Sequence, residues 1–113
     1  MKYIIAVIQP DRLDLVLDLL EKREIHLVTV TSVMGRGRQK GIAGVYRGHK
    51  EVGSLLKKVK LEIAVNEEFV KPTIDAITEG ARTGAIGDGK IFILDLKEVL
   101  RVRTGETGSV AIG

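Results

Sequence analysis

Cysteine and tryptophan are absent from this chain of 113 residues, and histidine occurs only twice. The lack of cysteine excludes disulfides, thiol chemistry and thiolate metal sites. His26 and His49 alone are too few for a histidine-rich metal centre. A chain without cysteine suits a reducing compartment, so we expect a cytoplasmic protein.

Long apolar runs are also absent. None approaches the roughly 20 apolar residues that a membrane helix needs. The N-terminal sequence MKYIIAVIQPD lacks the cleavage pattern of a signal peptide, and its short β-branched stretch is typical of a buried strand. We therefore expect no membrane insertion.

Positive charge is concentrated in one part of the chain. The net charge is +3, yet the segment from Arg36 to Lys60 holds eight bases against the single acid Glu51, so it carries +7 and the rest carries −4. Such a segment indicates an anionic ligand or partner. A solvated charged loop is the alternative.

The apolar pattern predicts two successive strand–helix–strand units. The first comprises a strand at 2–8, a helix from 10 to about 24 and a strand at 27–34. The second comprises a strand at 59–65, a helix at 70–81 and a strand at 90–96, with a short extension at 99–102. This order predicts an α+β, ferredoxin-like fold, with one antiparallel sheet and two helices on one face, as a single domain over 1–113.

Residues 36–57 show neither helical nor strand periodicity and carry most of the positive charge. A loop of that length in a small domain is usually functional or disordered. We expect a long protruding loop between the second and third strands, and we expect recognition to reside there.

The stretch ARTGAIGDGKIF, residues 81–92, contains three glycines and a lysine. Residues 84–90 match G-x-x-x-x-G-K, but Ile91 stands where a phosphate loop has Ser or Thr, and the stretch follows a helix and enters a strand. It is therefore not a P-loop. A phosphate-contacting turn over 82–90 and a plain helix-to-strand turn remain open.

Several motifs together resemble the P-II signal-transduction proteins, which are trimeric nitrogen regulators. TGAIGDGKIF at 83–92 looks like the family's C-terminal signature. GRGRQKG (35–41), VYRG (45–48), KVKLEIAV (58–65) and RVRTGE (101–106) resemble it in order and spacing. The resemblance covers essentially the whole chain.

The resemblance implies a homotrimer that binds ATP or ADP between neighbouring subunits. One subunit would wrap the phosphates with residues 87–90, and Arg101 and Arg103 would reach them from the next, forking onto phosphate oxygens. Arg38 would help when the loop folds back. Thr29, Glu62 and Ala64 would surround the adenine and ribose. The full implied nucleotide set is Thr29, Gly35, Gly37, Arg38, Gln39, Glu62, Ala64, Gly87, Asp88, Gly89, Lys90, Arg101 and Arg103.

The family also senses 2-oxoglutarate through a magnesium ion. By resemblance, Gln39 would coordinate Mg²⁺ together with the ATP phosphates and 2-oxoglutarate, and Lys58 would pair with the keto acid. Oxygen ligands and an incomplete protein cage suit magnesium. The implied 2-oxoglutarate set is Gly37, Gln39, Lys40, Gly41, Lys58 and Gly87.

The resemblance further implies a switch whose ligand state biases the basic loop. The usual target is an ammonium channel that the loop plugs, and Arg47 is the residue expected to enter it. A metabolic enzyme is another possible target of such a loop. The implied partner-binding residues are Tyr46, Arg47, Gly48, His49, Lys50 and Glu51.

The loop departs from the family's pattern at its tip. Glu51 replaces the tyrosine that many bacterial members have nucleotidylated, and His49 replaces the serine phosphorylated in cyanobacterial members. We therefore predict no uridylylation. Arg36 and Gly44 make the loop more positive than usual, which leaves open a variant that senses adenylate energy state or a small anion such as bicarbonate. Such a variant would control another transporter or carbon metabolism.

Two other classes fit less well. No Ser-His-Asp set, catalytic carboxylate pair or metal-binding histidine cluster is apparent, so we expect no enzyme beyond slow incidental ATP hydrolysis. Of four aromatic residues only Tyr46 lies in the basic segment, so no stacking platform for direct nucleic-acid binding is expected.

Overall fold

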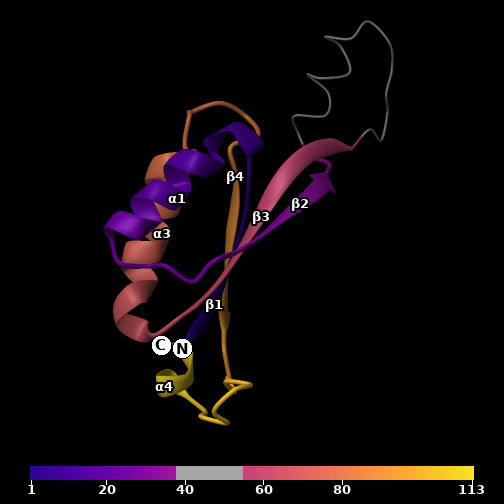
Figure 1. Ribbon diagram of the computed structural model, residues 1–113. Coiled ribbons are helices and arrows are strands. Elements are labelled where there is room, and N and C mark those ends of the chain that lie inside the picture. The colour runs from indigo at the N-terminus through magenta and orange to yellow at the C-terminus, as the bar shows by residue number, and fades with distance from the viewer. Residues whose placement is uncertain (38–54) are drawn as a thin grey trace, which may run out of the picture.

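The computed structural model describes residues 1–37 and 55–113 (Figure 1). Its sheet has the strand order β2-β3-β1-β4, and every neighbouring pair is antiparallel. Helices α1 and α3 lie side by side on one face of this sheet (Figure 1). The strands are β1 (Lys2–Ile8), β2 (Thr29–Gly35), β3 (Leu56–Val65) and β4 (Gly89–Asp95), and the two helices are α1 (Leu13–Lys22) and α3 (Val70–Ala81). The predicted ferredoxin-like fold is confirmed.

Alternation along the strands decides which face the helices cover. Ile4, Ala6 and Ile8 of β1 are buried, as are the alternate residues 59, 61, 63 and 65 of β3. These side chains meet Val16 and Leu20 of α1 and the buried face of α3 in one core. Because successive strand side chains point to opposite faces, the residues in between lie on the other face.

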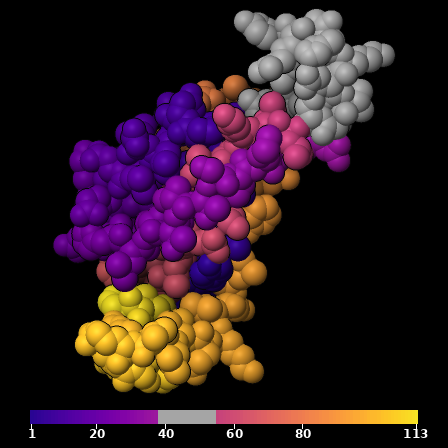
Figure 2. Space-filling view, turned by 45° about the vertical axis from the view of Figure 1, so that its right-hand side comes forward, coloured from indigo at the N-terminus to yellow at the C-terminus, as the bar shows by residue number. Residues whose placement is uncertain are grey.

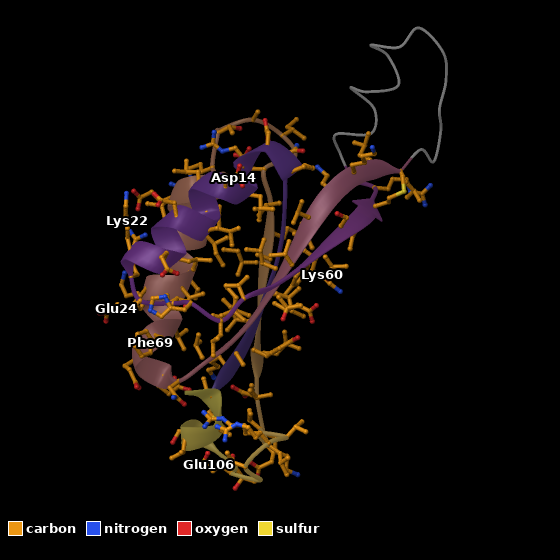
Figure 3. The ribbon with its side chains drawn as sticks, in the orientation of Figure 1. Asp14, Lys22, Glu24, Lys60, Phe69 and Glu106 are labelled. Atoms are coloured by element: carbon orange, nitrogen blue, oxygen red, sulfur yellow. The ribbon has the colours of Figure 1, made fainter. Side chains whose placement is uncertain are left out.

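Among the residues that the structure describes, no helix covers that other face of the sheet. The register aligns Tyr3 with Ala64 and Leu94, and Ile5 with Glu62 and Phe92. Phe92 is 48% exposed and Leu94 is 46% exposed. Lys60 lies on this side, away from Asp14 and Lys22 on the helical side (Figure 3). We call it the open face. Five predicted site residues share it: Thr29, Lys58, Glu62, Ala64 and Lys90.

Several predicted boundaries were wrong by a few residues. The second strand begins at Thr29 rather than Leu27, and β3 begins at Leu56, so the loop expected over 36–57 loses its last two residues to a strand. β3 pairs here with β2. The sequence Leu56-Lys57-Lys58 gave no sign of a strand, because two adjacent lysines break the polar–apolar alternation. The first helix opens with a 3-10 turn at Pro10–Arg12 and ends at Lys22, and another such turn at Glu67–Phe69 precedes α3. The last strand ends at Asp95.

The C-terminal part differs most from expectation. The extension predicted at 99–102 forms no strand. Leu100 makes one isolated antiparallel bridge to Thr107 instead, and a short helix, α4 (Ser109–Ile112), follows. Four residues are too few to show helical periodicity in a sequence. Residues 96–113 stand at one end of the molecule (Figure 2).

No helix within residues 1–37 and 55–113 has the length and apolar character to span a bilayer.

Glu24 sits where a helix end favours glycine. The Ile25 amide donates to the Leu20 carbonyl at 3.0 Å, which closes α1, and Glu24 has φ 62°. An L side chain in this region costs about 1–2 kcal/mol. We therefore expect Glu24→Gly to stabilise the fold by about 1 kcal/mol and raise Tm by several degrees in thermal unfolding. Glu24→Ala, which keeps the strain, is the control, and an equal gain from alanine would contradict this explanation.

Candidate anion-binding cleft

A cleft opens where the ends of β2, β3 and β4 meet the turn after α3. Its volume is about 590 Å³, which is ample for a small ligand. We call it the lysine cleft, because two lysines from separate segments line it. Its lining comprises Val7, Gly35, Arg36, Gly37, Lys58, Ile86, Gly87, Gly89, Lys90 and Phe92. Gly37 is the last described residue before the segment 38–54, which lies outside the described part of the chain.

Lys58 connects β3 to the glycine turn. Its Nζ donates a hydrogen bond to the Gly87 carbonyl at 3.4 Å. Burial lowers the pKa of the Lys58 ammonium below its usual value. A half-buried cation at the wall of a cleft interacts more strongly with an anion than an exposed one does, because water screens it less.

The glycine turn spans residues 82–88, between the end of α3 and the start of β4. Gly84, Gly87 and Gly89 have φ of 92°, 101° and 115°, values that L side chains rarely adopt. The Asp88 carboxylate accepts hydrogen bonds from the Thr83 and Gly84 amides at 2.7 and 2.9 Å. The side chain expected to contact phosphate is therefore bonded to the turn itself.

Three predicted adenine and ribose residues lie outside this cleft. Thr29 and Glu62 are register partners on β2 and β3. Tyr3 donates to Glu62 Oε2, and Lys60 Nζ lies 3.6 Å from Glu62 Oε1, so both carboxylate oxygens are engaged on the open face. Ala64 lines a second, mostly apolar pocket of about 320 Å³, which is bordered by Leu27 and Phe69.

The two C-terminal arginines lie at the other end of β4. Arg101 Nη1 is 3.0 Å from Glu106 Oε1, and its Nη2 donates to the Val110 carbonyl at 3.1 Å. Figure 3 shows Glu106 at the end of the molecule opposite the glycine turn. Since β4 has seven residues, it separates this segment from the lysine cleft by roughly 20 Å. Arg103 lies in the same exposed segment.

Of the predicted residues that the structure describes, six line the lysine cleft and six do not. Gly35, Gly37, Lys58, Gly87, Gly89 and Lys90 converge in the lysine cleft. Thr29, Glu62, Ala64, Asp88, Arg101 and Arg103 do not line it. The predicted residues Arg38, Gln39, Lys40, Gly41 and Tyr46 to Glu51 fall outside the described residues.

Four lining residues were not predicted as site residues. Arg36 stands between two glycines that were predicted, and Phe92 follows Lys90 by two, which places both on the same strand face. Those spacings were signals that could have identified them. Val7 and Ile86 carried no such signal, because apolar residues of this kind fill most strands and turns.

A small ferredoxin-like domain in which a glycine turn and two lysines line one cleft has the chemistry to bind an anion. The family model "Nitrogen regulatory protein P-II" matches residues 1–106. Nitrogen regulatory protein GlnK1 of Methanosarcina mazei is 53% identical over 114 residues, covering 99% of this chain and 97% of that protein. Nitrogen regulatory protein P-II of Bradyrhizobium diazoefficiens is 47% identical over 112 residues, covering 99% of this chain and all of that protein.

A solved structure is similar as well. The crystal structure of Arabidopsis thaliana PII bound to citrate matches with a TM-score of 0.78 at 39% identity, covering 96% of this chain and 86% of that one. The chain therefore belongs to the P-II family of nitrogen regulatory signal-transduction proteins. Members of this family are signalling proteins that act through partner proteins.

Proposed function

We propose that this chain is a subunit of a homotrimeric sensor that binds ATP or ADP, with Mg²⁺ and 2-oxoglutarate as effector, and regulates a transporter or enzyme of nitrogen metabolism. An ammonium channel is the target we favour, on the family resemblance of the loop. The protein would act in the cytoplasm and be recruited to the membrane by that transporter.

The lysine cleft is the observation that carries this proposal. Residues from β2, β3 and the glycine turn converge there, and they are the residues expected at the nucleotide phosphates and the keto acid. Backbone near Gly87 and Gly89 can approach an anion closely, and Lys90 supplies an exposed charge beside it. The Lys58 ammonium, which the Gly87 carbonyl helps to position, can donate a charge-assisted hydrogen bond to a carboxylate of the ligand.

Magnesium fits the donor chemistry in part. The residue proposed to coordinate it, Gln39, lies outside the described residues, and the remaining ligands would be oxygens of ATP and 2-oxoglutarate. Bound Mg²⁺ would neutralise phosphate charge and link the two anions. Within residues 1–37 and 55–113, no group of three His, Asp or Glu side chains could hold a metal ion.

The trimer is proposed because one chain does not complete the site. Arg101 and Arg103 lie far from the lysine cleft of their own chain, so a neighbouring copy would have to present them. The open face also exposes apolar side chains, among them Phe92 and Leu94. Apolar patches of this kind are typical of subunit interfaces.

Isothermal titration calorimetry of ATP and ADP, with and without Mg²⁺ and 2-oxoglutarate, tests the proposal. We expect 2-oxoglutarate to bind only when ATP and Mg²⁺ are present. Lys58→Ala should weaken that binding by at least about tenfold, because a charged hydrogen bond to the carboxylate is lost. Gln39→Ala should abolish it. Lys57→Ala is the matched control, since this exposed lysine on the same strand does not line the cleft.

The other outcomes are equally informative. Nucleotide binding without 2-oxoglutarate binding would replace the proposal with a sensor of adenylate state or of another anion such as bicarbonate. No nucleotide binding at all would contradict the proposed function.

A further inference from the structure

The glycine turn contains an acid beside the place where an anion is proposed to bind. A carboxylate facing a phosphate would repel it, so the presence of Asp88 calls for an explanation. Its contacts and its placement supply one.

Asp88 is bonded to the start of its own turn. Oδ2 accepts from the Thr83 amide at 2.7 Å and from the Gly84 amide at 2.9 Å, and the Thr83 hydroxyl donates to Oδ1. The Ala85 amide in turn donates to the Thr83 hydroxyl oxygen at 3.2 Å. One carboxylate therefore ties the end of the turn to its beginning.

Asp88 lines two hollows next to the turn but not the lysine cleft. It lines one hollow of about 290 Å³ with Ala81 and Arg82, and another of about 440 Å³ with Gln9 and Thr83. Its neighbours Gly87 and Gly89 line the lysine cleft, whereas Asp88 does not. The carboxylate is thus engaged by Thr83 and Gly84 at the start of the turn, while the two glycines that flank Asp88 line the cleft.

Without a tie, this backbone would have much conformational freedom. Glycine explores more of φ/ψ space than any other residue, and three of them lie within residues 84–89. Ordering such a segment on ligand binding reduces affinity, whereas ordering it beforehand does not. Asp88 provides that prior order from a position where its charge does not face the ligand.

Hydrogen bonds within the turn favour the ionised form of Asp88. Hydrogen bonds from Thr83, and then from Gly84, hold the pKa of its carboxyl below its usual value, and the nearby Arg12 guanidinium acts in the same direction. An ionised carboxylate has the acceptor capacity for all three hydrogen bonds at neutral pH.

We propose that Asp88 is a positioning residue of the anion-binding turn, which holds Gly87 and Gly89 toward the lysine cleft through Thr83 and Gly84 without contacting the ligand. This inference rests on the proposed function, because it assigns a role within that same site. It differs from the simpler expectation that Asp88 itself contacts phosphate.

The test compares Asp88→Asn, Thr83→Val and Thr83→Ser. Asparagine at position 88 keeps the shape of the side chain, but its amide nitrogen cannot accept a hydrogen bond. At position 83, valine lacks the hydroxyl group, whereas serine retains it. We expect Asp88→Asn to weaken ATP binding about tenfold, equally with and without Mg²⁺, while Tm changes by less than about 3 °C. Thr83→Ser should bind like the wild type, and Thr83→Val should weaken binding. The double variant Asp88→Asn/Thr83→Val should be no weaker than Asp88→Asn alone.

A spectroscopic readout separates positioning from general stability. In the wild type, the Thr83 and Gly84 amide proton resonances should shift as pH falls through the Asp88 pKa, and Asp88→Asn should remove that titration. Tighter ATP binding by Asp88→Asn would show that the carboxylate faces the ligand. Weaker ATP binding seen only with Mg²⁺ would indicate that Asp88 is a metal ligand. Unchanged ATP binding would show that Asp88 has no role in the site. Each of these three results overturns the proposal.

The experiment distinguishes a failure of the proposed function from a failure of the role proposed for Asp88. If the wild-type chain binds no ATP, both the function and this role are overturned. If the wild type binds ATP and Asp88→Asn is unaffected, only the role of Asp88 is lost.

Discussion

Gly89→Ala is expected to destabilise this protein by about 4 kcal/mol, a large share of the stability of a domain of this size. Gly89 begins β4 with φ 115°. A Cβ there would lie 2.0 Å from the Val7 carbonyl oxygen and 3.1 Å from the Ile8 Cα. Both obstacles are backbone atoms of the neighbouring central strand, so neither can move aside without disturbing the sheet.

Thermal and chemical unfolding would measure the effect. We expect Tm to fall by at least about 10 °C. Because Gly89 also lines the lysine cleft, nucleotide binding should weaken at temperatures where the variant is still folded.

Gly84→Ala is the matched control for this substitution. Gly84 has φ 92°, in the same region, but no atom of residues 1–37 or 55–113 lies within 4 Å of the Cβ position. Alanine there should cost only the backbone strain, about 1–2 kcal/mol. The difference between the two variants isolates the clash with Val7. Equal losses of stability in the two variants would show that the sheet adjusts to accommodate the added Cβ. The backbone conformation would then account for the whole effect.

Gly80→Ala is expected to destabilise the protein by about 2 kcal/mol, although alanine favours a helix by about 1 kcal/mol over glycine. Gly80 lies inside α3 where this helix crosses α1. An added Cβ would lie 2.7 Å from Val16 Cγ2 and 3.0 Å from Val16 Cα. Arg12 Nε donates to the Gly80 carbonyl at 2.8 Å, so separating the helices would also strain this bond.

The compensating variant Val16→Ala tests the cause. It removes the nearer obstacle, and the double variant should lose less stability than the sum of the two single changes, as contacting residues usually do. Unfolding in urea gives all three free energies. Simple additivity, or a rise in stability from Gly80→Ala alone, would show that the helices are not packed closely at this residue.

Local patterns in the sequence were sufficient for the order and type of the main elements. The 2–8 strand and the 70–81 helix match the structure residue for residue, because alternation and helical spacing are properties of neighbouring residues. The short helix α4 and the single bridge between Leu100 and Thr107 could not be predicted, because each depends on contacts between residues of the C-terminal segment, 96–113.

The candidate site was predictable only as a set of residues. The motifs indicated Lys58, Gly87 and Lys90, but their convergence in one cleft depends on β3 and β4 flanking β1 in the sheet. The motifs also assigned one role to Asp88 and to the two C-terminal arginines. Their contacts distinguish them: the Asp88 carboxylate accepts hydrogen bonds from the start of its own turn and does not line the cleft, and Arg101 pairs with Glu106.

By itself, the sequence determined the family, the fold and the chemical character of the site, because these follow from residue types and their spacing along the chain. Only the tertiary structure decided which of those residues share a cleft and which face away from it. The reason is that strand pairing brings together segments some fifty residues apart, such as Val7 and Lys60, while hydrogen bonds within a turn fix which way each side chain points. Neither kind of contact leaves a periodic trace in the sequence.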